Sequence, residues 1–300
     1  FVKRIENMKQ EENIDVLFLG PSSDSMRVAG NKNESREIAK KSAPGLNPPF
    51  FMLEGTTTQD LESFVESRCN TDHSQYQKYK DIYDNIVGSL QGSVAFKAVS
   101  GGGGKGIEKF AVDPDVDDET NFINCMGCML KNLKYVDGTE WEDKSIQVER
   151  WVDNAHHFEI QMVAAGGEAC LLPPRNCTLQ QKNQKIVEMN IIQGDYNPQL
   201  YAKAHHYGQL FADKLAQEGY KGVGTIEMLL VPGTEECCVD VGEDTYVLNE
   251  DTIDQVGDAF LLEVNTRLQV EHPVTQGDLA LKGINISLPW LQTLCCDNPD

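Results

Sequence analysis

A run of four glycines, Gly101 to Gly104, lies between two lysines, Lys97 and Lys105, in the segment FKAVSGGGGKGI. Consecutive glycines leave no Cβ in the way, so backbone N–H groups can close around an anion while the ammonium groups add positive charge. The pattern suits a polyphosphate, although it lacks the GxxxxGK[ST] signature of a P-loop. The alternative is a mobile glycine-rich loop that has no ligand.

Two carboxylates and an amide lie in or next to apolar segments. Glu227 is part of TIEMLLV and Glu263 is part of FLLEVN, with Asn265 two residues after it. A charged side chain in a buried strand is costly unless it is paired or binds a metal. These three groups offer the hard oxygen ligands that suit Mg²⁺ beside phosphates. The alternative is that both glutamates lie on edge strands and face water.

The segment NTRLQVEHPVTQ follows directly on the second of these strands. Strand alternation would place Asn265, Arg267 and Gln269 on one side, with Glu271 continuing the same phase. An arginine, a glutamine and a glutamate that converge beside metal carboxylates could bind a small planar anion and remove a proton from it. The alternative is a polar loop that leaves the sheet.

A fourth segment, RNCTLQQKNQKIVE, is basic and amide-rich in an otherwise acidic chain. Its Gln180, Asn183 and Lys185 are candidates for contacts with phosphates or a ribose. Taken alone, the segment has a simpler interpretation as a solvated surface strand. Its meaning therefore depends on the other three segments.

The remaining pattern predicts the elements that must position these residues. Apolar or alternating stretches predict strands at 15–19, 93–99, 145–148, 158–164, 225–231 and 259–264. Helices are predicted at 22–42 and 200–217, with further helical stretches between 58 and 83. Pro44, Gly45, Pro48 and Pro49 break the chain and predict a domain boundary. The acidic segment 233–258 is predicted to be a surface hairpin or insertion.

Composition restricts the class of protein. The formal net charge of −21 argues against non-specific nucleic-acid binding, which needs basic residues to neutralise phosphates. No run approaches the roughly 20 apolar residues of a membrane span. The nine cysteines are irregularly spaced, which indicates reduced thiols and an intracellular setting. Cys125 and Cys128 form a CxxC without a second zinc-type pair, so we interpret them as small apolar residues on a helix face.

Together the four segments resemble the biotin carboxylase family of the ATP-grasp superfamily, over most of the chain. GPSSDSMRVAGNKNESREIAKKS resembles the family's segment from its GPS turn to its GDK lysine, here Lys32. KAVSGGGGKGI resembles the glycine-rich lid loop, and ERWVDNAHHFEIQ resembles the hinge that contacts adenine. EVNTRLQVEHPVT is the most specific motif, because other ATP-grasp ligases share its glutamate and asparagine but not its EHPVT ending.

The resemblance implies a role for each candidate residue. Glu227, Glu263 and Asn265 would hold Mg²⁺ or Mn²⁺, and Lys185 would lie near the γ-phosphate. Glu271 would be the base that deprotonates bicarbonate, and Arg267 would lie next to the biotin enolate. Bicarbonate would also contact Gln269 and Val270. The implied ATP-binding residues are Lys32, Lys97, Gly101, Gly102, Gly103, Gly104, Glu149, Val152, His157, Gln180 and Asn183.

The implied fold is a mixed α/β (α+β) ATP-grasp fold with a mobile glycine-rich lid. Residues 1–48 would be the remainder of an N-terminal α/β domain, 49–150 the lid subdomain, and 151–300 the catalytic core. Parts of the family's N-terminal and C-terminal regions would be missing. The segment that is usually ERDC…QRRHQK also departs from the family pattern, at Pro174, Asn176, Gln181 and Asn183.

The implied function is MgATP-dependent and bicarbonate-dependent carboxylation of biotin through carboxyphosphate. The biotin would sit on a separate carrier domain or subunit, since the chain contains no AMKM motif. A carboxyltransferase domain or subunit would be a further partner, in a homodimer or larger assembly. The setting would be the cytoplasm, or a mitochondrial or plastid matrix. Two alternatives stay open: another ATP-grasp carboxylate ligase, or an ATP-binding regulatory homologue without turnover.

Overall fold

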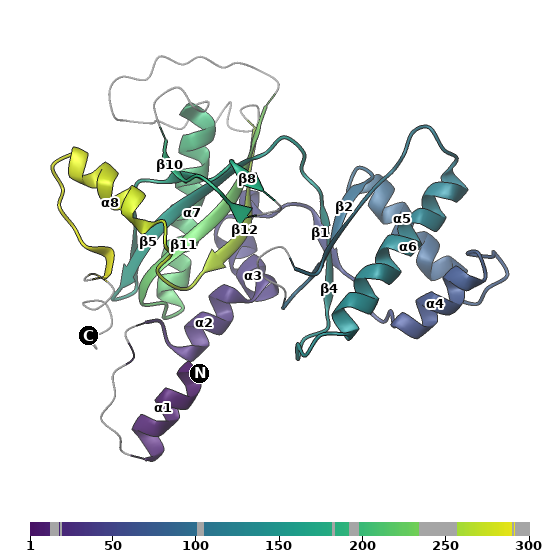
Figure 1. Cartoon of the computed structure of the whole chain (residues 1–300), viewed down its shortest axis with the longest axis horizontal. Helices are drawn as coiled ribbons and strands as arrows, with labels where there is room; N and C mark the ends of the chain where they lie inside the picture. Colours follow the sequence, from purple (N-terminus) through teal and green to yellow (C-terminus); the bar gives the residue numbers. More distant parts are fainter. Residues whose placement is uncertain are drawn as a thin grey trace. The chain divides into compact units, whose positions relative to one another are not determined.

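A computed structural model of the chain describes residues 1–12, 18, 20–100, 105–181, 184–191, 198–233, 257–289 and 291. The chain divides into two compact units (Figure 1). The first unit consists of Phe1–Asn47 and Asn154–Asp300, and the second unit of Pro48–Asp153. The break at residue 47 falls within the predicted boundary at residues 44–49. The functional assignment of the predicted domains stays a prediction.

The second unit is a four-stranded antiparallel sheet with helices packed against it (Figure 1). Alternation in the two central strands sends Phe96 and Val148 into the apolar core, and sends Lys97 and Glu149 to the opposite face. The strand order is β1 (Phe50–Met52), β4 (Ile146–Arg150), β2 (Ser93–Ala98) and β3 (Ile107–Ala111). The helices are α4 (Thr58–Glu66), α5 (Tyr76–Gly88) and α6 (Asp118–Asp137).

The cysteines of the CxxC motif lie on α6, as the sequence predicted. Cys125 is fully buried in the core of the second unit, and Cys128 is partly buried. Both are free thiols. Burial raises the pKa of the Cys125 thiol far above its usual range, so this group stays protonated and unreactive at neutral pH.

The first unit is built on an antiparallel sheet with the strand order β10, β7, β5, β11, β12, and β6 pairs with β5. The strands of a two-stranded hairpin, β8–β9, pair with each other and not with this sheet. The strands are β5 (His156–Ala165), β6 (Glu168–Leu171), β7 (Arg175–Asn176), β8 (Gln180–Gln181), β9 (Gln184–Lys185), β10 (Met189–Asn190), β11 (Gly222–Pro232) and β12 (Gly257–Asn265).

Among the described residues, six helical segments belong to the same unit as this sheet. The predicted helix at 22–42 is divided in two because Asn31 leaves the helical conformation and caps the second helix, where its side chain accepts hydrogen bonds from the N–H groups of Asn33 and Glu34. The segments are α1 (Val2–Glu11), α2 (Ser23–Gly30), α3 (Lys32–Ser42), the 3₁₀ turn η1 (Pro44–Leu46), α7 (Pro198–Gln217) and α8 (His272–Leu281). Among the described residues, no helix is long and apolar enough to cross a membrane.

The sheet of the first unit has one apolar face and one polar face. Helix α7 covers the apolar face, where Phe158 and Ile160 of β5 join Ile226 and Met228 of β11 in one core cluster. The residues between them in sequence therefore project from the other face. The predicted strand at 15–19 and most of the acidic segment 233–258 lie outside the described residues.

Candidate active site

Polar side chains gather on the face of the sheet in the first unit that lies opposite α7. His157, Glu159 and Gln161 alternate along β5, and Glu227 of β11 lies directly across from Glu159. Only 8% of His157, 5% of Glu227 and none of Glu159 is exposed. One ligand atom from each of these three residues lies within 4.8 Å of the others, so they could hold a metal ion. Buried groups of this kind need charge partners.

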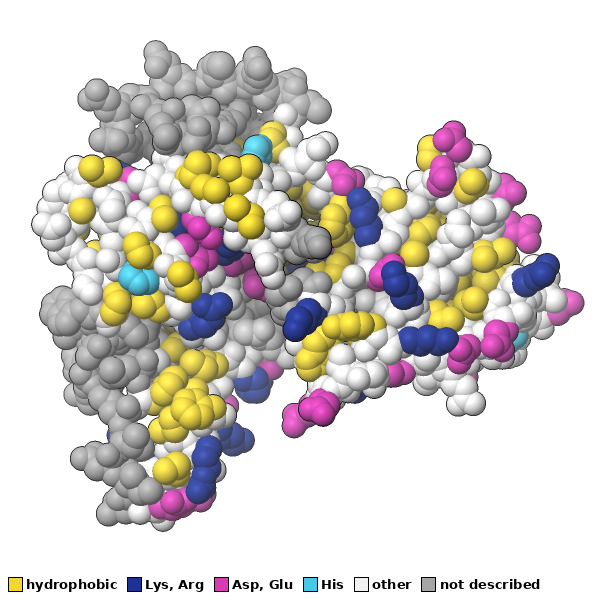
Figure 2. Space-filling view, in the orientation of Figure 1, with side chains coloured by type: hydrophobic (Ala, Val, Ile, Leu, Met, Phe, Trp, Pro, Cys, Tyr) yellow, Lys and Arg dark blue, Asp and Glu magenta, His cyan; other side chains and the backbone are white. Residues whose placement is uncertain are grey.

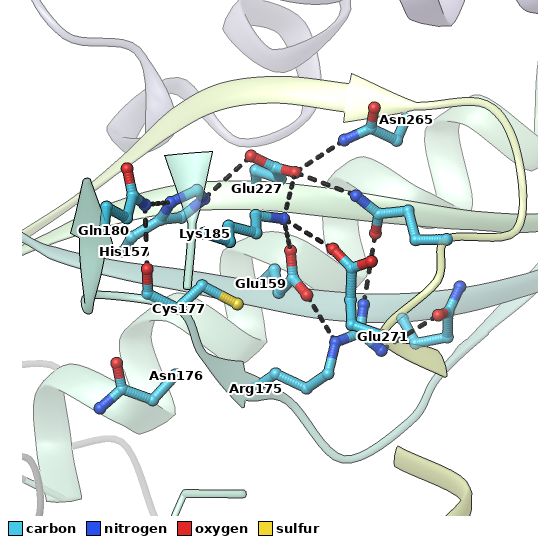
Figure 3. A network of polar contacts seen from close by, with 12 residues as sticks. His157, Glu159, Arg175, Asn176, Cys177, Gln180, Lys185, Glu227, Asn265 and Glu271 are labelled. Atoms are coloured by element: carbon cyan, nitrogen blue, oxygen red, sulfur yellow. Dashed lines mark hydrogen bonds and ion pairs between the residues drawn. The ribbon is translucent and has the colours of Figure 1, made fainter. Parts of the chain in front are cut away.

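Lys185 supplies that charge at the centre of the cluster (Figure 3). Its Nζ donates to Glu159, lies 2.8 Å from Oε1 of Glu227 and lies 3.0 Å from Oε1 of Glu271. Burial by itself would lower the pKa of Lys185, but the carboxylates of Glu227 and Glu159 outweigh it and raise that pKa well above its usual range. The ammonium group therefore stays charged at any physiological pH.

The carboxylate of Glu227 contacts four side chains of the network. Its Oε2 lies 2.9 Å from Nε2 of His157. Its Oε1 accepts from Nδ2 of Asn265 at 2.7 Å and from Nε2 of Gln269 at 3.1 Å, besides Lys185. Burial would raise the pKa of Glu227, but the hydrogen bond and charge of His157 and the charge of Lys185 lower it to about 2. The carboxylate is thus fixed in its anionic form.

The β8–β9 hairpin holds His157 in place. Nε2 of Gln180 contacts Nδ1 of His157 and donates to the carbonyl of Cys177 at 2.9 Å. The backbone N–H of His157 donates to Oγ1 of Thr178 at 3.0 Å. Both ring nitrogens of His157 therefore have polar partners, Gln180 at Nδ1 and Glu227 at Nε2.

Arg175 is a member of the site that the sequence interpretation did not single out. Its guanidinium group is fully buried, and its Nε donates to Oε1 of Glu159 at 2.5 Å. Glu159 was missed as well. The available signal was a glutamate in phase with His157 in an alternating strand. The pairing that places Arg175 directly across from Glu159 is a property of the sheet register.

Glu271 joins the site from the start of α8, where it is the N-cap residue. Its Oε1 contacts Lys185, and only 11% of its side chain is exposed. Burial would raise the pKa of Glu271, but its own backbone N–H, Lys185 and Arg175 lower it. The group is therefore a carboxylate at neutral pH, which is the form that a general base needs.

One geometric prediction is wrong. Strand β12 ends at Asn265, and residues 266–271 are not part of a strand. The alternation that would put Arg267 beside Gln269 therefore does not continue. Gln269 turns back onto Glu227, whereas Arg267 is exposed and its Nη1 donates to the carbonyl of Leu268 at 3.3 Å. Val270 is 91% exposed.

Comparison with known proteins identifies the family of this chain. Residues 78–242, more than half of the chain, match the model of the carbamoyl-phosphate synthase L chain ATP-binding domain. The chain belongs to that ATP-binding domain family. Its curated relatives include biotin carboxylases and carboxylases. The chain is 28% identical over 287 residues to urea amidolyase of Saccharomyces cerevisiae, which covers 95% of this chain and 12% of that protein.

A second relative is chloroplastic biotin carboxylase 2 of Populus trichocarpa, which is 29% identical over 262 residues, or 87% of this chain and 38% of that protein. The chain thus spans well under half the length of these relatives. A biotin carboxylase structure from Campylobacter jejuni aligns with a TM-score of 0.62 at 18% identity, over 100% of this chain and 53% of that one. Pyruvate carboxylase of Rhizobium etli aligns with a TM-score of 0.62 at 22% identity, over 100% and 20%. The fold of this ATP-binding domain is therefore the ATP-grasp fold of biotin carboxylases.

The predicted metal ligands of the ATP-binding domain offer oxygen atoms, which are the donor atoms that a divalent cation such as Mg²⁺ prefers. Glu227 and Glu263 are register partners on neighbouring strands, so their side chains start from the same face. Glu263 is partly buried. An ammonium group already sits among the carboxylates, which shows that this face attracts positive charge. His157 and Glu159 are further possible ligands that the sequence interpretation did not assign to the metal.

The other predicted nucleotide contacts are distributed over both units. In the second unit, Nζ of Lys97 lies 2.5 Å from Oε1 of Glu149, and both residues are buried. Val152 follows β4 and is partly buried. Lys32 is the first residue of α3 in the first unit. Gly101, Gly102, Gly103, Gly104 and Asn183 lie outside the described residues.

Proposed function

We propose that this ATP-grasp domain is a biotin carboxylase, which uses MgATP and bicarbonate to carboxylate the biotin of a separate carrier. The observation that carries the proposal is the cluster around Lys185, where one ammonium group contacts the carboxylates of Glu159, Glu227 and Glu271. This cluster contains a proposed base, Glu271, next to a cation that could neutralise a phosphate, Lys185, and a carboxylate that could bind a metal, Glu227 (Figure 3). The biotin carboxylases among the relatives support it.

In the proposed reaction, Glu271 takes the proton of bicarbonate. Its lowered pKa keeps it ionised at neutral pH, and Lys185 next to it stabilises negative charge on the anion. The bicarbonate oxygen then attacks the γ-phosphate of ATP, which gives carboxyphosphate and ADP. Carboxyphosphate then splits into CO₂ and inorganic phosphate, the phosphate takes the N1 proton of biotin, and N1 bonds to CO₂ to give carboxybiotin. Arg267 is the proposed electrostatic partner of the biotin enolate.

Glu227, Glu263 and Asn265 are the proposed ligands of Mg²⁺ or Mn²⁺. The cation supplies positive charge that offsets the charge on the transferring phosphoryl group. Glu227 suits this role because it stays anionic, with a pKa near 2. Its partners Asn265 and Gln269 hold the carboxylate in one orientation.

The proposed ATP contacts come from several segments. The buried pair Lys97–Glu149, together with Val152, would recognise the adenine end or a phosphate, and His157, Gln180 and Lys32 would reach the ribose or phosphates. A carrier domain that bears biotin and a carboxyltransferase are the proposed partners. The biotin carboxylase domain of 2-oxoglutarate carboxylase from Hydrogenobacter thermophilus is a dimer in its crystal structure, and we propose a homodimer or larger assembly here. We propose the cytoplasm or an organelle matrix as its compartment.

The proposal is tested by the release of ADP from MgATP, measured with and without bicarbonate and free biotin in the whole native chain. A biotin carboxylase needs bicarbonate for ADP release and yields carboxybiotin. Release that responds instead to another carboxylic acid would identify a different ATP-grasp ligase. Binding of ATP without any release would identify a regulatory homologue, which the changes at Pro174, Asn176 and Gln181 would then explain.

A further inference from the structure

Besides its ion pair with Glu159, Arg175 donates hydrogen bonds to three other side chains among the described residues. Its Nη1 donates to Oε1 of Gln161 at 3.1 Å and to Oγ1 of Thr275 at 2.8 Å. Its Nη2 donates to Oε1 of Gln269 at 3.3 Å. No part of the residue is exposed. One side chain on β7 thus joins the central sheet to a segment about a hundred residues later in the sequence.

Thr275 shows why the end of the EHPVT motif matters. Its side chain is buried, accepts from Arg175 and donates to the carbonyl of Pro173 at 3.2 Å. The hydroxyl group therefore connects the first turn of α8 to the segment that leads into β7. No role in ATP or bicarbonate binding has been assigned to this threonine, and its contacts face the protein interior.

The two contacts of Arg175 on this segment flank Glu271. Gln269 lies two residues before Glu271, and Thr275 lies four residues after it. Glu271 itself reaches Lys185. A guanidinium group can hold both flanking residues because its donors form a rigid planar fork, whereas an ammonium group is a single point charge.

We propose that Arg175 is a positioning residue that fixes the Gln269–Thr275 segment to the sheet and so keeps Glu271 beside Lys185. The inference deepens the proposed function, because it names the group that sets the geometry of the proposed bicarbonate base. Its structural part can be tested without any turnover. Its functional part rests on the proposed carboxylase activity.

The structural test is amide hydrogen exchange in Arg175→Lys, compared with Arg36→Lys as a matched control. Arg36 is also a buried arginine, 2% exposed, but it lies on α3. The lysine variant keeps the positive charge beside Glu159 and loses the fork to Thr275 and Gln269. Exchange in peptides that cover residues 269–276 should rise roughly tenfold or more, because two hydrogen bonds are lost. Unchanged exchange there, or an equal rise in the Arg36 variant, would overturn the inference.

Thr275 provides a second variant that leaves all charges in place. Thr275→Val has the same shape without the hydroxyl group, so it should raise exchange in the same peptides. Thr275→Ser keeps a hydroxyl group and should restore the wild-type rate. If Arg175→Lys does not fold, the pair Arg175→Met with Glu159→Gln removes both buried charges together and is measured instead. Wild-type exchange in both Thr275→Val and the measured Arg175 variant contradicts the proposal.

The functional test uses ADP release in the whole native chain. In Arg175→Lys the KM for bicarbonate should rise about tenfold while the KM for ATP changes less than about twofold, since the lost contacts lie at the proposed bicarbonate end. A general loss of folding would instead lower the active fraction and leave both KM values alone. If the wild type does not respond to bicarbonate, the proposed function fails, and hydrogen exchange still decides the role of Arg175.

Discussion

Each of the two units contains a lysine whose ammonium group contacts carboxylates of a sheet, but the two lysines have different surroundings. Among the described residues, Lys97 in the second unit contacts one carboxylate, that of Glu149. Lys185 in the first unit contacts three, with Arg175 as the nearby second cation. The three carboxylates therefore exceed the two cations by one negative charge, and acidic and basic side chains mix on the surface of this unit (Figure 2). A balanced pair suits a structural or nucleotide contact, whereas an excess of negative charge suits recruitment of a divalent cation.

The largest expected effect distinguishes the cluster around Lys185 from the Lys97–Glu149 pair, because each is proposed to act in a different step of the reaction. Glu271→Gln removes the proposed base and should lower bicarbonate-dependent ATP cleavage by roughly 10²–10⁴-fold. The affinity for ATP should change little, because the proposed adenine contacts lie on other segments. Glu149→Gln should do the reverse, weakening ATP binding while ATP cleavage still depends on bicarbonate. ADP release and ATP titration calorimetry on both variants measure this contrast. Equal losses of ATP cleavage and of ATP affinity in the two variants would contradict it.

The exposed Arg267 should show a smaller effect, limited to the second half of the reaction. Arg267→Ala should reduce carboxylation of free biotin by roughly 10²–10³-fold, the usual cost of losing one electrostatic donor. ATP cleavage should fall less. Its exposure and its hydrogen bond to the carbonyl of the neighbouring Leu268 predict no loss of thermal stability. Equal losses in carboxylation and in ATP cleavage would remove Arg267 from the biotin site.

The charge contrast itself can be tested with Mn²⁺ and no nucleotide. Lys185→Met removes the resident cation from among three carboxylates, so the affinity of the folded protein for Mn²⁺ should rise about tenfold. Lys97→Met should leave that affinity unchanged, because Lys97 pairs with Glu149 and not with any of these three carboxylates. Electron paramagnetic resonance of free Mn²⁺ measures both variants, with circular dichroism as the check on folding. A rise in both variants, or in neither, means that the excess charge does not recruit the metal.

Sequence patterns predicted the three long strands of the site, β5, β11 and β12, because alternation and apolar runs are local, but they predicted neither the short strands β7, β8 and β9 nor helix α8. The apolar segments around Glu227 and Glu263 are β11 and β12, and Asn265 does reach Glu227. The partners Glu159 and Arg175 depend on strand pairing between distant segments, which no local pattern encodes. The wrong prediction for Arg267 has a related cause, because strand alternation was extended beyond Asn265, where β12 ends.

Most of the candidate roles are still predictions. The family and the ATP-grasp fold follow from the match to the ATP-binding domain family and from the solved structures. Contacts with ATP, Mg²⁺ and bicarbonate depend on ligands, and the sequence could suggest them only by resemblance. Geometry adds what resemblance did not, namely that Lys185, Glu227 and Glu271 form one network.

The smallest expected effect concerns stability against pH, and it tests whether Glu227 is held as an anion. The pKa of Glu227 is lowered from 4.5 to about 2 in the folded protein. Its contribution to stability is therefore fully present above the unfolded value and is lost as pH falls toward the folded value. Between pH 7 and pH 4 the loss should be about 1 kcal/mol, measured by urea unfolding. Glu227→Gln has no such titration, so its curve should be flatter by that amount, whereas Glu168→Gln, at an exposed position on β6, should follow the wild type. Parallel curves for wild type and Glu227→Gln would show that Lys185 and His157 do not hold this carboxylate in its charged form.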